Sequence, residues 1–441
     1  MGDREVSMSM RKLPGAGSLM DFSSNDYLGF SGNREIFDRA HQILSERKHF
    51  KNGATGSRLL SGNHPLYSEL ERKLAEFHQT ESALVFNSGY DANIGFFGCV
   101  PQRGDIVFYD ELVHASIRDG ITMGNAKSYK FGHNDLEDLS AKLNRMGLMG
   151  NRLHRPADDL LEMSDGDSGA SSGGESTGQS HGPTSSNDRA YLKPQQDSEV
   201  YIVTESVFSM DGDSPNLEAF AVFCQRNGYR FIVDEAHAVG VFGKRGEGLV
   251  QHLNLQGEVF ARIITFGKSI GCHGAAILGS ADLKKYLVNF ARSMIYTTGL
   301  PPHSVATILS SYEQLIASHE KPDEVADQIR KLTENILFFN RQLEKLELVA
   351  ANVHPQKTED VADLKPYFIP STSAIHCCII PGNERATEIA EKLQSAEFDI
   401  RPILAPTVPA GQERIRICLH NFNTEKEINE MLTLLSESIR R

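Results

Sequence analysis

Short apolar runs alternate with segments of helical periodicity along most of this 441-residue chain. After Pro65, the apolar residues Leu66, Leu70, Leu74 and Phe77 recur at intervals of three or four, which places them on one face of a helix. The apolar runs are shorter and rich in β-branched and aromatic residues, as is typical of buried strands. They lie at residues 83–86, 106–109, 200–204, 229–233 and 263–265. Buried strands separated by helices predict an α/β fold with a mostly parallel, doubly wound sheet.

The last third of the chain continues this alternation around one long helical region. The predicted elements are a strand at 276–278, a helix at 284–291, a helical region from 303 to about 346, strands at 374–380 and 414–419, and helices at 385–394 and 425–439. We therefore predict an N-terminal arm (1–52), a large α/β domain (53–295) and a smaller C-terminal α+β domain (296–441).

Residues 153–198 interrupt the large domain with a stretch of Ser, Gly and Asp that offers almost nothing to bury. Such a stretch cannot offset the entropy that it would lose on ordering. We predict a flexible surface insert that takes no part in catalysis.

Composition narrows the classes of partner. Lys and Arg total 45 against 58 Asp and Glu, and the net charge of −13 argues against nucleic-acid or anionic-membrane partners. No run approaches the about 18 apolar residues of a membrane span, and the N-terminus lacks a signal-peptide core.

The six cysteines are scattered without Cys-x-x-Cys spacing, so neither a zinc site nor a disulfide framework is expected. We expect a cytoplasmic protein with reduced thiols.

Lys268 is the first candidate for chemistry, in the small-residue stretch TFGKSIG at 265–271. Lysine is strongly hydrated and is rarely placed where burial would remove its water. A desolvated lysine loses its proton more readily and can form a Schiff base with a carbonyl. Considered alone, an exposed loop lysine between two glycines is the simpler interpretation.

Asp234 ends the predicted strand at 229–233, and ligands bind beyond the carboxyl ends of strands in open α/β sheets. A buried carboxylate there needs a cation or several donors. A helix N-cap is an equally good interpretation for a single Asp at a strand end. His237 lies three residues further on, and by itself it is better interpreted as a packing histidine.

Three more polar segments follow strands. Gly89 lies where a strand meets a helix, and free N–H groups at a helix N-terminus can hold a phosphate. His114 offers a flat ring that could stack on an aromatic cofactor, and Ser209 offers a hydroxyl donor. The alternatives are a strand–glycine–helix junction without a ligand, a surface loop histidine and a turn serine.

The order of these weak signals is informative. A phosphate cradle, a stacking histidine, a strand-end carboxylate and a Schiff-base lysine are the groups that pyridoxal 5'-phosphate (PLP) requires. The carboxylate keeps the pyridine nitrogen protonated, so that the ring can accept electrons, and the lysine holds the aldehyde. We therefore expect PLP as the cofactor.

Four motifs carry a resemblance to a known family. They are NDYLG at 25–29, GATGSR at 53–58, DEAH at 234–237 and TFGK at 265–268. With them the chain resembles the α-oxoamine synthases, which are PLP-dependent acyltransferases of fold type I. The resemblance covers nearly the whole chain outside the insert.

The resemblance implies catalytic roles for three residues. Lys268 would form the Schiff base with PLP and then remove the α-proton of the amino acid. Asp234 would pair with the pyridine nitrogen of PLP. His237 would contact the ring hydroxyl and assist catalysis.

The resemblance also implies binding roles. His114 would stack on the PLP ring, and Ser209 would lie near its hydroxyl. The phosphate would be held by Gly89, Tyr90 and Thr265, with Thr297 or Thr298 reaching in from a second subunit. Arg414 would bind the substrate carboxylate, and Arg11 would be a second arginine on the substrate side.

Within the family, three segments resemble the branch that serves biotin synthesis. They are FSMDGD at 208–213, GAA at 274–276 and PTVP at 406–409. This resemblance implies L-alanine and pimeloyl-CoA, or another pimeloyl thioester, as substrates of a homodimer with shared active sites. Members that use glycine or serine stay open, as does a non-catalytic partner subunit, although such subunits usually lack the lysine.

Overall fold

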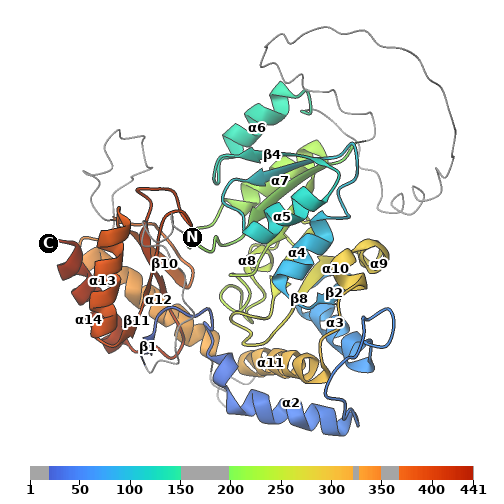
Figure 1. The fold of residues 1–441 in the computed structure, drawn as a ribbon, viewed down its shortest axis with the longest axis horizontal. Helices are drawn as coiled ribbons and strands as arrows, with labels where there is room; N and C mark the ends of the chain where they lie inside the picture. Colours follow the sequence, from blue (N-terminus) through green and yellow to red (C-terminus); the bar gives the residue numbers. More distant parts are fainter. Residues whose placement is uncertain (1–18, 150–197, 321–326, 349–366, 441) are drawn as a thin grey trace, which may run out of the picture.

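The computed structural model describes residues 19–149, 198–320, 327–348 and 367–440. Within these residues, seven strands form one sheet in the order β2-β8-β7-β6-β5-β3-β4 (Figure 1). Their bounds are Ser82–Phe86 (β2), Ile106–Asp110 (β3), Lys127–Phe131 (β4), Val200–Glu205 (β5), Arg230–Asp234 (β6), Ala261–Thr265 (β7) and Ala275–Gly279 (β8). Of these, β8 runs antiparallel to both of its neighbours, and the pairs from β4 to β7 are all parallel. The predicted mostly parallel α/β sheet is confirmed.

The edge strand β4 was not predicted. Its sequence is KSYKF, and only Phe131 is fully buried. An edge strand faces solvent, and charged residues there discourage pairing with another chain. The strand therefore lacks the apolar run by which the central strands were recognised.

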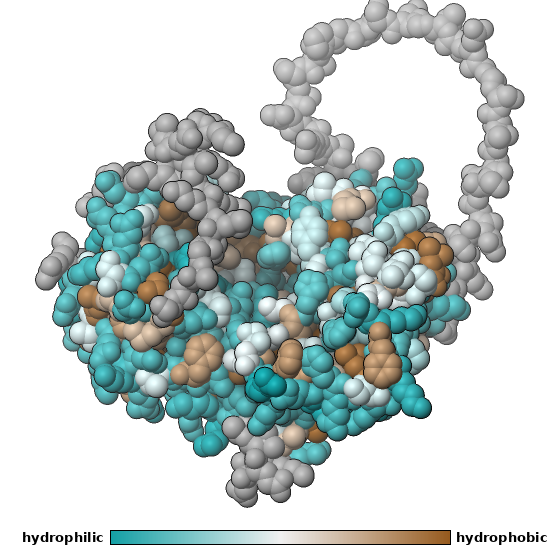
Figure 2. All heavy atoms as spheres, turned by 60° about the horizontal axis from the view of Figure 1, so that its bottom comes forward, coloured by the Kyte–Doolittle hydropathy of each residue, from teal (hydrophilic) through white to brown (hydrophobic). Residues whose placement is uncertain are grey.

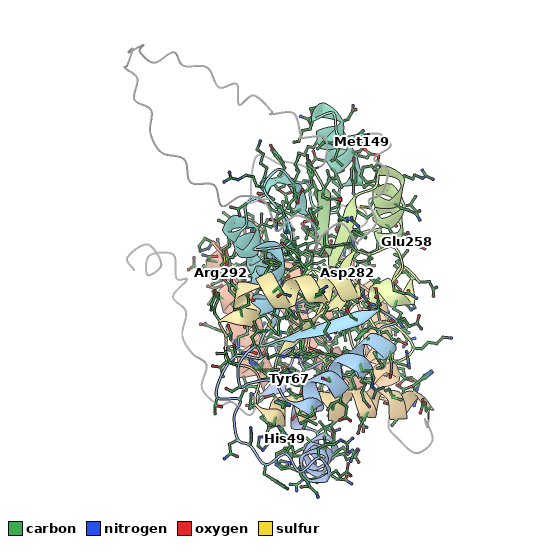
Figure 3. All side chains as sticks on the ribbon, turned by 90° about the vertical axis from the view of Figure 1, so that its right-hand side faces the viewer. His49, Tyr67, Met149, Glu258, Asp282 and Arg292 are labelled. Carbon is green, nitrogen blue, oxygen red and sulfur yellow. The ribbon has the colours of Figure 1, made fainter. Side chains whose placement is uncertain are left out.

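Both faces of the sheet are covered by helices. Successive strand residues point to opposite faces, so Val203 and Ile232 belong to one apolar core while Ile202 and Val233 belong to the other. The first core is completed by α4 (Gly89–Phe97), α5 (Ala115–Met123), α9 (Ala281–Phe290) and α10 (Arg292–Ile295). The second is completed by α3 (Pro65–Phe77), α6 (Leu136–Arg145), α7 (Leu217–Asn227) and α8 (Leu249–His252). Figure 3 shows this layering from the side, with α9, which carries Asp282, and α3, which carries Tyr67, on opposite sides of β2.

The C-terminal part forms a second sheet, in the order β12-β13-β10-β9 among the described residues. Its strands are Tyr367–Phe368 (β9), Ile375–Ile379 (β10), Arg401–Ile403 (β12) and Arg414–Cys418 (β13), all antiparallel to their neighbours. It packs with α12 (Gln328–Lys345), α13 (Asn383–Ser395) and α14 (Glu425–Ile439). A small α+β unit of the predicted kind is therefore present.

The N-terminal arm lies along the C-terminal part before it reaches the large sheet. The strand β1 (Met20–Asp21) pairs in parallel with β11 (Phe398–Asp399). Further on, Phe22 accepts a hydrogen bond from the Cys418 backbone, and Tyr27 accepts one from the Asn421 backbone, at 2.8 and 2.9 Å. The short 3-10 helix η1 (Phe30–Gly32) and α2 (Arg34–Glu46) follow. The arm thus brings residues 25–27 to the junction of the two parts.

The helical region predicted at 303–346 contains two helices, α11 (Pro302–Glu320) and α12, on either side of a segment outside the described residues. The first of them packs against α2: Ser310 Oγ donates to Ile36 O at 3.0 Å, and Arg39 pairs with Glu313 at 2.8 Å. The domain boundaries at 52 and 295 stay predictions. The insert predicted at 153–198 lies outside the described residues except for Ser198. No helix in the described ranges is long and apolar enough to cross a membrane.

Candidate active site

Polar residues end four neighbouring strands of the large sheet. Asp110 ends β3, Glu205 ends β5, Asp234 ends β6 and Thr265 ends β7. The parallel register places Glu205 directly beside Asp234. All four therefore lie at the carboxyl edge of the sheet, where ligands bind in open α/β folds.

Lys268 lies in the loop between β7 and β8, and its Nζ is 2.7 Å from Nε2 of His237. The loop is held against η1: Gly271 has a φ of 65°, and a Cβ there would lie 2.3 Å from the backbone N of Ser31. Only glycine fits such a contact. Burial lowers the pKa of Lys268 to about 8, although Asp234 and Glu205 act to raise it. The amine is therefore partly unprotonated near neutral pH, as a base or nucleophile must be.

Asp234 is 5% exposed and accepts two hydrogen bonds from neutral groups, Nδ2 of Asn93 at 3.0 Å and the backbone N of Ala236 at 2.9 Å. Burial raises the pKa of its neighbour Glu205 to about 8, and the charge of Asp234 contributes to this increase. Glu205 therefore keeps its proton at neutral pH.

A buried ion pair on the interior side holds the turn between Asp234 and His237. Glu235 is fully buried and contacts Arg262 of β7 at 2.6 Å, and its other oxygen accepts from the backbone N of Val250 at 2.9 Å. Glu235 thus faces the interior, while Asp234 and His237 face the site. Burial lowers the pKa of His237 well below its ordinary value, so the ring is neutral.

The predicted phosphate cradle lies at the start of α4. Ser88 caps this helix by accepting from the backbone N of Asp91 at 3.0 Å. The backbone N–H groups of Gly89 and Tyr90 have no acceptor among the described residues, as expected for the first turn of a helix. A Cβ on Gly89 would lie 3.7 Å from Oγ1 of Thr265, so these two residues are adjacent. The side chain of Tyr90 instead turns outward and donates to Asp119 at 2.8 Å.

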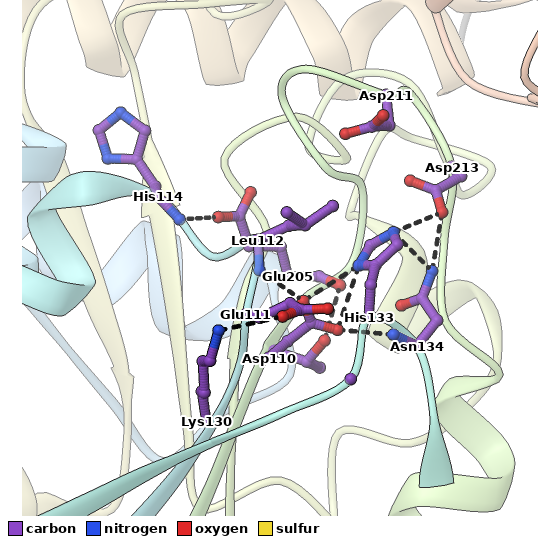
Figure 4. Close-up of polar contacts among 12 residues, drawn as sticks. Asp110, Glu111, Leu112, His114, Lys130, His133, Asn134, Glu205, Asp211 and Asp213 are labelled. Atoms are coloured by element: carbon purple, nitrogen blue, oxygen red, sulfur yellow. Dashed lines mark hydrogen bonds and ion pairs between the residues drawn. The ribbon is translucent and has the colours of Figure 1, made fainter. Parts of the chain in front are cut away.

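His114 is exposed and caps α5, and its Nδ1 accepts from the backbone N of Ser116 at 3.2 Å. The Ser116 hydroxyl in turn accepts from Nδ2 of Asn93, which also holds Asp234. The backbone N of His114 donates to Glu205, as Figure 4 shows. His114 is thus joined to both strand-end carboxyls.

Ser209 and Thr298 border the site through their backbones. The Ser209 carbonyl accepts from Nε of Arg416 at 2.7 Å. Thr298 forms a bridge with Ser57, and its carbonyl accepts from the side chain of Asn87, just before the phosphate cradle. The contribution of Thr298 to a second subunit stays a prediction.

Arg416, two residues after the predicted Arg414, contacts the arm that reaches His237, and the substrate role of Arg414 stays a prediction. The guanidinium of Arg414 is already held by Asp211 and by the Met210 carbonyl at 2.9 Å. Arg416 Nη2 instead donates to Oδ1 of Asn25 at 2.9 Å, in the arm that reaches His237. The two arginines lie two residues apart on β13 and share a face, so sequence periodicity could not separate them. Arg11 lies outside the described residues.

The contacts of Asn25 and Tyr27 with the site were not predicted from the sequence. Tyr27 is fully buried, and its hydroxyl lies 2.7 Å from Nδ1 of His237 and 3.1 Å from Oδ1 of Asn25. The signal was present in the NDYLG motif, where two polar residues precede a buried tyrosine, but no local pattern predicts their partners at positions 237 and 416.

A partly buried histidine beside the site contacts two carboxylates (Figure 4). His133 contacts Asp110 through Nδ1 at 3.0 Å and Asp213 through Nε2 at 2.9 Å. Burial alone would lower the pKa of His133, but these two contacts outweigh it and raise the pKa to about 10. The imidazolium therefore ties the loop at 208–213 to the end of β3.

Comparisons with known proteins identify the family to which this chain belongs. Residues 18–149 and 184–435 match the family of class I and II aminotransferases, so the chain belongs to this family of PLP-dependent enzymes. The 8-amino-7-oxononanoate synthase of Emericella nidulans is 36% identical over 99% of this chain and 94% of its own length. Within the family, the chain is thus an α-oxoamine synthase, a PLP-dependent acyltransferase most like 8-amino-7-oxononanoate synthase.

Two solved structures share the fold. A serine palmitoyltransferase solved with PLP has a TM-score of 0.73 at 25% identity, covering 95% of this chain and 87% of that one. The 8-amino-7-oxononanoate synthase of Francisella tularensis has a TM-score of 0.66 at 24% identity, covering 96% and 98%. The fold-type I architecture expected from the sequence is confirmed.

The residues of the site fit PLP. The free N–H groups of Gly89 and Tyr90, with the adjacent Thr265 hydroxyl, suit a phosphate. Asp234 is buried and hydrogen-bonded by neutral groups alone, so a protonated ring nitrogen would supply the positive charge that it lacks. The lowered pKa of Lys268 leaves its amine free to react with an aldehyde.

The raised pKa of His133 predicts a pH-dependent contribution to stability. A histidine whose pKa is higher in the folded protein stabilises it fully below the unfolded value near 6.5, and the effect is lost as pH rises through about 10. We expect His133→Gln to lower the free energy of unfolding by about 2 kcal/mol at pH 6.5, because two charged hydrogen bonds are lost. The difference from wild type should shrink towards pH 10, as measured by urea denaturation.

Lys130→Gln is the matched control, because Lys130 pairs with Glu111 at 3.4 Å on the same strand–loop unit but is 65% exposed. It should change stability by less than about 0.5 kcal/mol at any pH. A constant difference between wild type and His133→Gln from pH 6.5 to 10 would contradict the assignment.

Proposed function

We propose that this protein joins L-alanine to pimeloyl-CoA, or to another pimeloyl thioester, and releases CoA and CO2 to give 8-amino-7-oxononanoate for biotin synthesis. The observation that carries this proposal is the near full-length similarity to the Emericella nidulans enzyme. The segments at 208–213, 274–276 and 406–409 support the same branch. The cytoplasmic location stays a prediction from the sequence.

PLP, when bound, supplies an electron-accepting ring that stabilises negative charge at the α-carbon of the amino acid. Gly89, Tyr90 and Thr265 would hold its phosphate, Asp234 its ring nitrogen and Lys268 its aldehyde. His114 would cover one face of the ring, and Ser209 and His237 would lie towards its hydroxyl.

The chain's own residues would carry the proton transfer. The Lys268 amine, partly unprotonated because of burial, would take the α-proton of alanine. His237 orients this amine through the contact at 2.7 Å between Nε2 and Nζ. Arg416 and Asn25, which already contact one another at 2.9 Å, would bind the alanine carboxylate, a group that the planar fork of arginine fits well.

Serine palmitoyltransferase activity is the second candidate. The structural likeness favours it, because the TM-score to a serine palmitoyltransferase (0.73) exceeds that to the 8-amino-7-oxononanoate synthase (0.66). It differs from the first candidate in both substrates, serine instead of alanine and a long acyl chain instead of a pimeloyl group.

Turnover with matched substrates decides between these functions. We expect CoA release, followed with a thiol reagent, to be fastest for L-alanine with pimeloyl-CoA, and mass spectrometry to identify 8-amino-7-oxononanoate. Glycine with acetyl-CoA or succinyl-CoA, and serine with palmitoyl-CoA, are the competing pairs. Lys268→Ala should lose turnover with every pair. A preference for serine and palmitoyl-CoA would contradict the first proposal and support the second.

The substrate role of Arg416 predicts a selective effect on alanine. Arg416→Lys should raise the KM for L-alanine by about 10- to 100-fold, since a charged hydrogen bond contributes about 1.5–3 kcal/mol. The KM for pimeloyl-CoA should change less. Arg401→Lys is the control, because this arginine pairs with Asp399 at 2.9 Å and is 48% exposed. A selective rise for Arg414→Lys, with Arg416→Lys unaffected, would restore the assignment made from the sequence.

We also propose a homodimer in which each subunit completes the other's site. Large apolar side chains are exposed beside the phosphate cradle, notably Leu60 (85%) and Tyr296 (72%). The segments that carry them are joined by the bridge between Ser57 and Thr298. Figure 2, which brings forward the lower side of Figure 1, shows hydrophobic side chains at the surface among hydrophilic ones. Exposed apolar groups of this size are typical of a protein interface.

The dimer predicts that Leu60→Asp shifts the protein towards monomer in sedimentation velocity and lowers turnover, because a buried charge disfavours association. Leu337→Asp is the control, since Leu337 lies on α12 and is 54% exposed. It should leave the sedimentation coefficient unchanged. A wild-type protein that is monomeric and fully active at micromolar concentration would contradict the proposal.

A further inference from the structure

A continuous chain of hydrogen bonds runs from the substrate-side arginine to the reactive lysine. It links Arg416 Nη2 to Asn25 Oδ1 (2.9 Å), Asn25 Oδ1 to the Tyr27 hydroxyl (3.1 Å), that hydroxyl to His237 Nδ1 (2.7 Å), and His237 Nε2 to Lys268 Nζ (2.7 Å). Its members come from β13, the arm, the turn after β6 and the loop after β7. Tyr27 and His237 are buried, with 0% and 4% exposure.

The chemistry of the donors fixes the direction of this chain. A guanidinium can only donate, so the Asn25 atom that it contacts is the amide oxygen. An amide oxygen can only accept, so the hydrogen bond between Tyr27 and Asn25 uses the single proton of the Tyr27 hydroxyl. The Tyr27 oxygen is then left as an acceptor, and the short contact with His237 requires a proton on Nδ1.

A neutral imidazole carries one proton, and the lowered pKa of His237 keeps the ring neutral. With that proton on Nδ1, Nε2 has a free lone pair facing Lys268. Nε2 therefore accepts from an N–H of Lys268 Nζ, and the lone pair of the lysine amine is not consumed by this hydrogen bond.

We propose that Tyr27 is a positioning residue that fixes His237 in the Nδ1–H tautomer, so that the lone pair of Lys268 stays available for the α-proton. The opposite tautomer would place a proton on Nε2, and this proton would be donated to the very lone pair that the base requires. This role rests on the function proposed above, in which Lys268 is the base. It deepens that function by making the arm a part of the catalytic geometry.

Removal of the Tyr27 hydroxyl should change the tautomer. In Tyr27→Phe, the buried Nδ1–H would lose its acceptor, which is unfavourable, and above pH 8, where the Lys268 amine is unprotonated and offers a lone pair, the proton should move to Nε2. In Asn25→Ala, the Tyr27 hydroxyl would lose the oxygen to which it donates and should turn to donate to Nδ1. Both variants should therefore favour the Nε2–H tautomer by different routes.

The tautomer can be read directly with 15N-labelled histidine, because protonated and bare ring nitrogens have well-separated 15N shifts. The signals of His237 are identified among the 16 histidines by their loss in His237→Asn. We expect Nδ1–H in the wild type, with PLP and after its removal, and a shift towards Nε2–H in both variants in PLP-free protein above pH 8, where the Lys268 amine is free and unprotonated. This measurement needs no turnover, so it decides the inference even where the proposed substrates are wrong.

Kinetics provide the second measurement. We expect Tyr27→Phe to lower kcat by about 10- to 100-fold, a part of the usual contribution of a positioned general base, with the KM for L-alanine changed by less than about threefold. Tyr312→Phe is the matched control, because Tyr312 is also fully buried and its hydroxyl contacts Nε2 of His78 at 2.9 Å, outside this chain of contacts. The control should keep kcat within about twofold of wild type and leave the His237 signals unchanged.

Two results would overturn the proposal. One is an Nε2–H tautomer of His237 in the wild type. The other is a folded Tyr27→Phe that keeps the Nδ1–H tautomer and the wild-type kcat. If Tyr27→Phe does not fold, Asn25→Ala decides by the same 15N measurement, and an unchanged Nδ1–H signal there overturns the proposal too.

Discussion

The site depends on the burial of one amine among carboxyl groups. Lys268 lies where the charge of Asp234 raises its pKa, yet loss of water lowers that pKa to about 8. A more exposed lysine would have a higher pKa and would keep its proton. Without the charge of Asp234, the pKa of Lys268 would be lower still. The tight approach of Gly271 to the backbone of Phe30 and Ser31 holds the loop that carries Lys268 against the arm.

Three acidic residues end adjacent strands of one sheet, an arrangement that would repel strongly if all were ionised and unpaired. The repulsion is reduced in a different way at each of the three residues. The imidazolium of His133 pairs with Asp110, Glu205 keeps its proton, and Asp234 is held by neutral donors that leave it free to face a cation. The charge is thereby concentrated on the one carboxylate that faces the cofactor nitrogen in the proposed function.

The sequence was sufficient for those parts of the fold and site that depend on local pattern. The central strands are apolar runs, and Asp234, His237 and Lys268 follow such runs directly, so both the sheet and its reactive edge could be predicted. The strand β4 could not, because an edge strand with two lysines has no apolar run. The contact of Arg416 with the arm could not be predicted either, because Arg414 and Arg416 share one face of β13 and only their partners, Asp211 and Asn25, distinguish them.

The role of the arm shows why long-range contacts escape such prediction. Tyr27 and His237 are 210 residues apart in the sequence, and Asn25 and Arg416 are 391 residues apart. No periodicity relates residues at such separations. What joins them is the pairing of β1 with β11, which lays the arm on the C-terminal part before it enters the junction. Because Arg416 belongs to that same part, the arm and the arginine are positioned by one packing event. A movement of the C-terminal part relative to the large sheet would therefore change the contact of Tyr27 with His237 as well as the position of Arg416. In the proposed function, the arm therefore links the arginine for the substrate carboxylate to the lysine base through the contacts of Asn25 and Tyr27.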